Sequence, residues 1–460
     1  MTRALHTSLR QRLNGFHPLR VLVLGVVCTT LCIPVASALS AEIVPTRSIT
    51  TNGITVLFLE QHFIPTVEIH ALVKVGSAQD PPDKAGLANL TASLLDEGTV
   101  TRTSRQFAEQ IDFVGGSLEA HAAEDFTTAS ARVLKKDADL GFALLADMLQ
   151  HPAFHKQEVE RVRTQILGEI VSDDDDPGNV AMKAFHQLIF HGHPYSWPAH
   201  GSEDTLNKIT VADIQQFHAK EYLPNQTILV IVGDLTQEQA TTLVQTHFGS
   251  WKKGPSSPYV LKKPAPIERK MVQLIEKDLT QSTIVLGHTG ISRTNPDYYA
   301  VTVMNYILGA GGFSSRLMDS IRDKQGLAYG IMSHFDTRLM PGAFFINLQT
   351  RTDVTNQAIT GVLTEVKGIR DAPVTDQELS EAKSFIIGSF PLRVDSSAKL
   401  ANVLAQVEFY NLGLDYFTHY PKAIEKVTKD DVLRVAKQYL DPQHYALVVV
   451  GSIAKAKVKQ

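Results

Sequence analysis

The sequence has only two cysteines in 460 residues, Cys28 and Cys32, and both lie near the N-terminus. In residues 1–38, four arginines precede an apolar run that ends in Ala36-Ser37-Ala38. This order is typical of a secretory signal peptide, and we expect cleavage after Ala38. The mature chain would then contain no cysteine, which excludes disulfides and thiolate metal ligands.

An uncleaved membrane anchor is the alternative interpretation of this stretch, because the apolar run is almost long enough to span a bilayer. Pro34 and the small residues at its end favour cleavage. We therefore expect a periplasmic or secreted protein that is not stably inserted in a membrane. Removal of the arginines makes the net charge more negative than the −4 of the full chain. An acidic exported protein is a poor candidate for binding nucleic acid or an anionic membrane surface.

The sequence lacks metal ligands at three positions of a predicted helix where a zinc site could otherwise form. Residues 86–99, GLANLTASLLDEGT, predict a helix on which Asn89 and Ser93 lie one turn apart with Ala92 beside them. Histidines at the two outer positions and a glutamate at the middle one would hold zinc and activate a water. An amide, a methyl group and a hydroxyl cannot do so. We therefore predict that this chain binds no metal and that these small residues pack a helix.

Three other polar groups could suggest a metal site, but each has a simpler interpretation. His121 to Asp125 contains His-x-x-Glu, yet it falls in a strand-like region where residues four apart do not stack as on a helix. The acidic run Asp173 to Asp176 lacks the spacing of a calcium loop and is expected to be a solvated loop. The remaining histidines surround a predicted turn without an accompanying carboxylate pattern: His191, His193 and His200.

The mature chain contains an internal duplication. Residues 157–168 resemble residues 377–388, and residues 209–234 resemble residues 427–452. Both matches are separated by about 220 residues, a period of domain size rather than that of a solenoid repeat. We predict two homologous domains, at 43–250 and 269–456. The proline- and lysine-rich segment 251–268 would link them.

Each half mixes strand and helix patterns. The apolar runs 228–234 and 446–452 predict buried strands, and 111–134 predicts a hairpin-like strand region. Residues 140–150 and 297–308 have helical spacing. The predicted fold class is α+β, occurring twice.

The most informative segment of the second half is GAGGFSSRLMDSIRDKQGLAYG, residues 309–330. Ser314 or Ser315 can cap a short helix that runs to about Lys324, and a strand is predicted after the following glycine. The reversal could point Arg322 and Tyr329 into one cavity, where both could donate to a peptide carbonyl or its oxyanion. Chemistry alone favours a surface arginine and a half-buried tyrosine.

Taken together, the motifs resemble the pitrilysin family of zinc metallopeptidases, to which mitochondrial processing peptidase belongs. The resemblance covers about residues 43–452. It implies two homologous α/β-sandwich domains of the processing-peptidase type. It rests on Gly86-Leu87-Ala88, Gly98-Thr99, His193-Pro194-Tyr195, Gly201, Pro224, Gly233-Asp234, Ser315-Arg316-Leu317, Arg322 and Gly326-Leu327-Ala328-Tyr329.

The resemblance assigns roles to particular residues. In the family, an arginine and a tyrosine seven residues apart contact substrate beside the scissile bond, and Arg322 and Tyr329 have this spacing. The family's zinc-binding histidines and catalytic glutamate align with Asn89, Ser93 and Ala92. Glu169 matches its third ligand, but a single carboxylate does not make a zinc site.

Some family members work as two related chains, one with the zinc motif and the other with the arginine and tyrosine. The resemblance therefore implies a non-catalytic, substrate-binding subunit of an exported heterodimeric zinc peptidase. Zinc would be bound by a homologous partner, and the substrate would be a peptide. The alternatives are an inactive structural or peptide-binding homologue, and a self-sufficient peptidase with unusual ligands.

Overall fold

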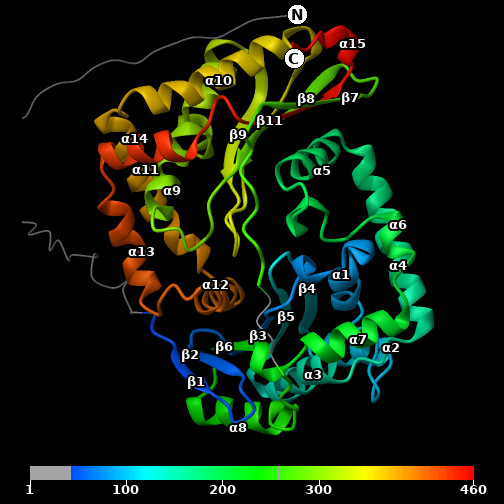
Figure 1. Ribbon diagram of the computed structural model, residues 1–460. Helices are drawn as coiled ribbons and strands as arrows, with labels where there is room; N and C mark the ends of the chain where they lie inside the picture. The colour runs from blue at the N-terminus through cyan, green and yellow to red at the C-terminus, as the bar shows by residue number, and fades with distance from the viewer. Residues whose placement is uncertain (1–42, 256–259, 460) are drawn as a thin grey trace, which may run out of the picture. The chain divides into compact units, whose positions relative to one another are not determined.

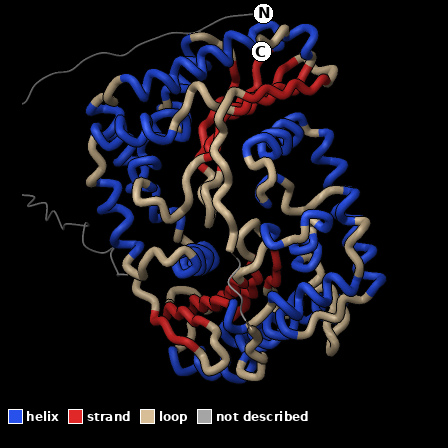
Figure 2. Tube along the Cα trace, in the orientation of Figure 1, coloured by secondary structure: helices blue, strands red, loops and turns tan. Residues whose placement is uncertain are grey.

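The computed structural model describes residues 43–255 and 260–459, so the expected signal peptide and its cleavage site lie outside the described residues. The strands gather into two sheets surrounded by helices, as Figures 1 and 2 show. The expected α+β class with two similar domains is confirmed. None of the helices in these ranges is long and apolar enough to cross a membrane.

The first sheet has the order β1-β2-β6-β3-β5-β4. All neighbours pair antiparallel except β2 and β6, which are parallel. Strand β6 is buried along its whole length, in agreement with its unbroken apolar sequence. The strands are β1 (Thr46–Ile49), β2 (Thr55–Glu60), β3 (Thr66–Val73), β4 (Ser117–Ala122), β5 (Thr127–Leu134) and β6 (Thr227–Gly233).

The second sheet repeats this arrangement. Its order, β7-β11-β8-β10-β9, matches β2-β6-β3-β5-β4 position by position, and its one parallel pair, β7 with β11, matches β2 with β6. The order therefore agrees with the duplication inferred from the sequence. The strands are β7 (Met271–Glu276), β8 (Gln281–Thr289), β9 (Ala328–Phe335), β10 (Ala343–Arg351) and β11 (Ala446–Gly451).

The helices also repeat down to their caps. Thr210 is the N-cap residue of α7 and Thr428 that of α14, and each exchanges hydrogen bonds with an aspartate three residues later. The first half contains α1 (Leu87–Ala92), α2 (Ser104–Phe113), α3 (Ala138–Gln150), α4 (Lys156–Asp175), α5 (Pro177–Ile189), α6 (Glu203–Leu206), α7 (Val211–Glu221) and α8 (Gln237–Phe248). The second contains α9 (Tyr298–Asn305), α10 (Thr355–Asp371), α11 (Asp376–Ser389), α12 (Ser397–Phe409), α13 (Tyr416–Glu425), α14 (Lys429–Tyr439) and α15 (Ile453–Ala456).

The two halves exchange one helix each. Helix α5 of the first half packs on β8 and β11 of the second sheet, where Phe185 lies in one apolar cluster with Val448. The equivalent helix α12 packs on β3 and β6 of the first sheet, where Leu404 lies in one cluster with Val230. Figure 1 shows α12 beside the first sheet and α5 beside the second. Neither sheet can therefore bury both faces with helices of its own half alone.

A polar junction also joins the halves. The Tyr195 hydroxyl donates to Oδ1 of Asp125 at 2.5 Å and accepts from the Met340 N–H at 3.3 Å. The other oxygen of Asp125 accepts from the Leu339 N–H at 2.7 Å. The Arg338 guanidinium lies 4.8 Å from the centre of the Tyr195 ring. The tyrosine of the His193-Pro194-Tyr195 landmark therefore ties the first half to the β9–β10 connection.

Two local predictions need correction. The strand region begins at 117 rather than 111, because α2 extends to Phe113 under a capping box from Thr103. The acidic run is helical rather than a solvated loop: α4 continues to Asp175, and Asp176 caps α5 through the N–H groups of Gly178 and Asn179. The predicted helix at 297–308 is present, with α9 continued by a π-helix over Tyr306–Ala310.

Because each half lends a helix to the other sheet, we expect the two halves to unfold in a single transition. The two tryptophans, Trp197 and Trp251, report on the first half and the segment that follows it, whereas far-UV circular dichroism reports on both halves. The midpoints of urea unfolding should coincide for the two signals. Phe185→Ala should lower both together, at a cost of about 3–5 kcal/mol. Separate midpoints would show that the halves unfold independently.

Candidate functional site

The helix that would carry zinc in a catalytic relative keeps its structural frame. Asp80 caps α1 by accepting the N–H groups of Gly86 at 2.8 Å and Ala88 at 2.9 Å. Burial raises the pKa of Asp80 to about 7, although these backbone bonds act in the opposite direction. Gly86 has φ of +98°, and a Cβ there would lie 2.7 Å from the His200 carbonyl oxygen. The glycine is therefore required by the fold whether or not a metal is bound.

The ligand positions of this helix do not fit zinc. Asn89 and Ser93 are half-buried and one turn apart, with the Ser93 N–H donating to the Asn89 carbonyl at 2.9 Å, and Ala92 is fully buried. Glu169 is exposed on α4, where it accepts from Gln165 at 3.2 Å. Across residues 43–255 and 260–459, no group of three or more His, Cys, Asp or Glu side chains could hold a metal ion. The chain therefore has the helix of a zinc site but not the side chains that would bind zinc.

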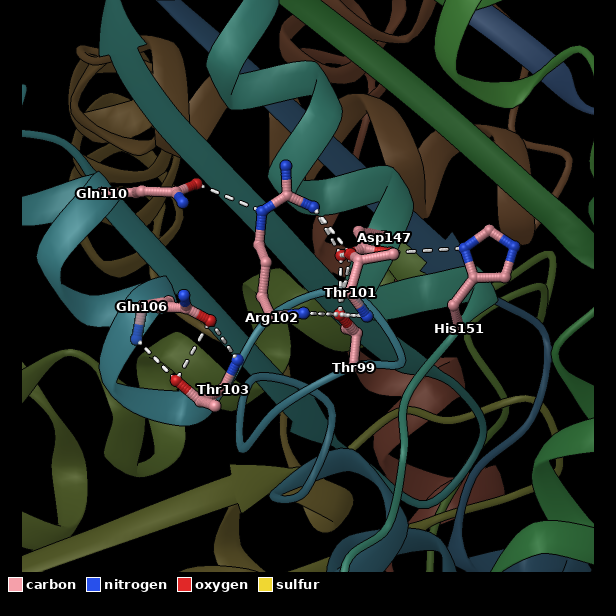
Figure 3. A network of polar contacts seen from close by, with 8 residues as sticks. All are labelled: Thr99, Thr101, Arg102, Thr103, Gln106, Gln110, Asp147 and His151. Atoms are coloured by element: carbon pink, nitrogen blue, oxygen red, sulfur yellow. Dashed lines mark hydrogen bonds and ion pairs between the residues drawn. The ribbon is translucent and has the colours of Figure 1, made fainter.

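The Gly98-Thr99 landmark also has a structural role (Figure 3). Asp147 of α3 accepts from the Thr99 and Thr101 hydroxyls, both at 2.7 Å, and from Arg102 at 2.6 Å. Gly98 has φ of +112°, which lets the chain turn into this cluster. Burial by itself raises the pKa of Asp147, but the three hydrogen bonds outweigh it and the pKa lies below its ordinary value. The loop after α1 is thus fixed by a satisfied buried carboxylate.

The histidines singled out in the sequence have separate local roles. His121 lies on strand β4 with its side chain largely exposed, in agreement with the prediction of a lone strand histidine. His193 accepts from the Tyr195 N–H at 3.1 Å, and its other nitrogen lies 2.8 Å from the Lys262 carbonyl oxygen. His200 lies 3.9 Å from Asp173. These side chains belong to turns and ion pairs.

The helix around Arg322 begins and ends at the residues expected, but its hydrogen bonding is different. Ser315 provides the cap, since its hydroxyl accepts from the Met318 N–H at 3.5 Å. Gly326, with φ of +60°, follows the helix end, and β9 begins at Ala328. The helix Met318–Lys324 is a π-helix, a form that often occurs at functional sites. It brings Arg322 close to the strand that carries Tyr329.

The guanidinium of Arg322 lies between two aromatic rings, with its carbon 4.7 Å from the centre of Phe313 and 5.8 Å from the centre of Tyr329. One of its nitrogens donates to Asp323 at 2.9 Å, and the side chain is 30% exposed. Nearby Arg316 is engaged differently, because it forms a two-point ion pair with Glu378 at 2.6 and 3.0 Å. Arg316 anchors the helix to α11, whereas Arg322 keeps N–H donors available.

A β-bulge places Tyr329 at the surface. Ala328 pairs with Thr350 and Ile331 with Leu348, so Tyr329 and Gly330 together face Gln349 alone. A bulge of this kind redirects a side chain out of the normal alternation. Tyr329 is accordingly 91% exposed rather than half-buried.

Tyr329 borders a cavity of about 520 Å³ between strands β8, β9 and β10 and the N-terminal turns of α5. Apolar side chains such as Met182, Val285 and Leu348 line it, together with polar residues: Asn179, Thr283, Asn347 and Gln349. The side-chain oxygen of Asn347 is buried and has no hydrogen-bond partner within the described residues. The cavity therefore offers apolar and polar walls beside an exposed phenol.

Sequence reasoning missed Phe313 and Asn347. Phe313 lies in the glycine-rich stretch already singled out. Only the structure shows that its side chain is 70% exposed and lies against the guanidinium of Arg322. Asn347 lies in an ordinary alternating strand, β10, and nothing in its sequence context sets it apart.

The chain is similar to known proteins along most of its length. Residues 55–202 match the family described as insulinase, peptidase family M16, and residues 208–386 match the one described as peptidase M16 inactive domain. An uncharacterized zinc protease of Rickettsia felis is 30% identical over 336 residues, which cover 72% of this chain and 80% of that protein. The non-peptidase homolog YmxG of Helicobacter pylori is 26% identical, over 93% of this chain and 99% of that protein.

A solved structure is also similar to this chain. The crystal structure of a peptidase M16 inactive domain from Pseudomonas fluorescens superposes with a TM-score of 0.84 and 29% identity, covering 88% of this chain and 98% of that one. The chain belongs to peptidase family M16, as the resemblance to the pitrilysin family implied. Because Asn89, Ala92 and Ser93 replace the zinc-binding and catalytic residues, it is a member of the non-catalytic type.

The Asp147 cluster gives a stability test with a defined pH dependence. Asp147→Asn should lower the free energy of unfolding by about 1–3 kcal/mol at pH 7, because charged hydrogen bonds to a buried group are lost. Since the folded pKa of Asp147 is depressed, its contribution is present above the unfolded value and lost as pH falls through the folded one. The difference between the wild type and the variant should shrink from pH 7 to about pH 3 in urea titrations. A difference independent of pH would contradict this.

Proposed function

We propose that this chain is the substrate-binding subunit of an exported heterodimeric zinc peptidase, in which a homologous partner holds the metal. In this proposal Arg322 and Tyr329 bind the peptide next to the bond that the partner cleaves. The observation that carries it is the pairing of an exposed tyrosine with an arginine that retains free donors, while residues 43–255 and 260–459 contain no group of side chains that could hold a metal ion.

The chemistry of the pair supports this role. A guanidinium has five N–H donors, and the one hydrogen bond of the Arg322 side chain described above leaves most of them available. A phenol adds one neutral donor. Donors that are already in position stabilise an oxyanion more than the carbonyl from which it forms, so the pair would lower the barrier to hydrolysis. Phe313 and Tyr329 would hold the guanidinium in place by contact with its faces.

The cavity beside Tyr329 supports a peptide as ligand. Apolar walls suit a side chain of the substrate, and the polar side chains in the lining, such as Gln349, could bond to its backbone. A metal-bound hydroxide would have to come from the partner, because the helix positions of this chain provide no zinc ligands.

A structural or peptide-binding protein without a part in hydrolysis is the second candidate. The relative described as a non-peptidase homolog favours it, since that protein aligns over nearly its entire length with this chain. The two proposals differ in whether Arg322 and Tyr329 affect turnover.

Purified alone, the mature chain should contain no stoichiometric zinc and cleave no peptide, because its ligand positions are an amide, a methyl group and a hydroxyl. Mixed with a homologous exported chain that has an intact His-x-x-Glu-His motif, it should raise peptidase activity well above that of the partner alone. Elemental analysis measures the zinc content, and cleavage of a quenched fluorescent peptide measures the peptidase activity. One zinc per isolated chain, or mixtures that never exceed the partner, would refute the proposal.

Arg322→Ala and Tyr329→Phe should each lower kcat of the mixed enzyme by about 10²–10³-fold, the usual effect of removing one oxyanion donor. Neither should change the unfolding midpoint greatly, because both side chains are at least partly exposed. Arg105→Ala is the matched control, since Arg105 is an exposed arginine on α2. Unchanged turnover in both variants would favour the structural role.

A further inference from the structure

A second cavity, of about 220 Å³, lies among helices α9, α12 and α13 and the turn Phe390–Arg393. It shares no lining residue with the cavity beside Tyr329. Its charged lining residues are two arginines, Arg293 and Arg393, and no aspartate or glutamate is among them. The cavity therefore carries positive charge without a counter-charge in its wall.

Neither arginine forms an ion pair within the described residues. Nη2 of Arg293 donates to the Tyr416 hydroxyl at 3.0 Å, and Nη1 of Arg393 lies 3.4 Å from the Tyr420 hydroxyl. Arg434 of the same half is, by contrast, paired with the carboxylate of Asp297 at 2.8 and 3.0 Å. Each guanidinium of the cavity thus has a neutral partner and several unused N–H donors.

Aromatic rings hold both arginines in position. The Arg293 guanidinium carbon lies 3.8 Å from the centre of the Tyr298 ring, and that of Arg393 lies 5.6 Å from the centre of the Tyr420 ring. Their hydroxyl partners, Tyr416 and Tyr420, are one turn apart on α13. Cation–π contacts fix the planar groups without neutralising them, which leaves their forks ready to bind an oxyanion at two points.

The remaining wall is mainly apolar. It consists of Phe390, Val394, Val403, Val407 and Leu412, with Gln406 as a further polar group. A fully hydrated inorganic ion gains little from such a wall, whereas an anion with a small apolar group gains from it. The volume is equivalent to about seven water molecules, enough for a molecule the size of benzoate.

We propose that this cavity binds a small organic oxyanion, a carboxylate or a phosphate monoester with a short apolar group. Arg293 and Arg393 would bind its oxygens, and the valines and leucine would contact its apolar part. The site belongs to the second half alone, and the proposal does not depend on a peptidase partner.

Isothermal titration calorimetry of the mature chain tests this with three probes of similar size: benzoate, phenyl phosphate and neutral benzyl alcohol. We expect at least one anion to bind with Kd below about 1 mM, and benzyl alcohol to bind at least about tenfold more weakly. Benzoate alone would assign the site to carboxylates, and phenyl phosphate alone to phosphate esters. No saturable binding of either anion at 10 mM, or equal binding of benzyl alcohol, would overturn the proposal.

Variants locate the binding. Arg293→Gln and Arg393→Gln should each weaken anion binding by at least about tenfold, and Arg105→Gln, on the first half, should leave it unchanged. Arg393 is exposed, so Arg393→Gln is expected to fold. If Arg293→Gln does not fold, the Arg393 variant alone tests whether the anion binds in this cavity. Unweakened binding in Arg393→Gln would show that the anion binds elsewhere.

Discussion

The packing of α5 and α12 on each other's sheets is the constraint on which the rest of this structure depends. A sheet must cover its apolar faces, and here each half leaves one face to a helix from the other. The N-terminal turns of α5 form one wall of the cavity beside Tyr329, and the opposite wall is the second sheet. The candidate peptide site therefore exists only because a helix of the first half lies on the sheet of the second.

The polar groups at the boundary reinforce this constraint. Asp125 is buried and accepts hydrogen bonds from Tyr195 and from the backbone of Leu339, which lie in different halves. Burial raises the pKa of Asp125, while the tyrosine and backbone donors act against that rise. The Tyr195 landmark thus serves the joint between the halves. Its presence in a chain with Asn89, Ala92 and Ser93 at the zinc-site positions is explained by folding rather than by catalysis.

Much of the fold could be predicted from the sequence, because local patterns decide it. Buried strands β6 and β11 follow from unbroken apolar runs, and the Thr-x-x-Asp caps of α7 and α14 follow from capping chemistry. Ser315 and Gly326 bound the helix of Arg322 as expected. The acidic run is largely exposed to solvent, as expected, but its backbone is helical rather than a loop, because Asp176 and Asn179 satisfy the junction of two helices.

The site was less predictable, for a physical reason. Arg322 and Tyr329 could be placed near each other, but the exposure of Tyr329 depends on a bulge between β9 and β10, and the pairs that bound this bulge join residues 17 and 22 positions apart. Phe313 and Asn347 acquire their importance only from neighbours in space. Long-range pairing leaves no local periodicity, so such features require coordinates.

The burial of Ala92 has an evolutionary consequence. Restoring a zinc centre would require histidines at two positions and a carboxylate at a third, and that third position is fully enclosed. A glutamate introduced there first would carry the cost of a buried acid with no metal to offset it. Any return to zinc binding that passes through a glutamate at position 92 without the two histidines is therefore destabilised, although the frame held by Asp80 and Asp147 would still be intact.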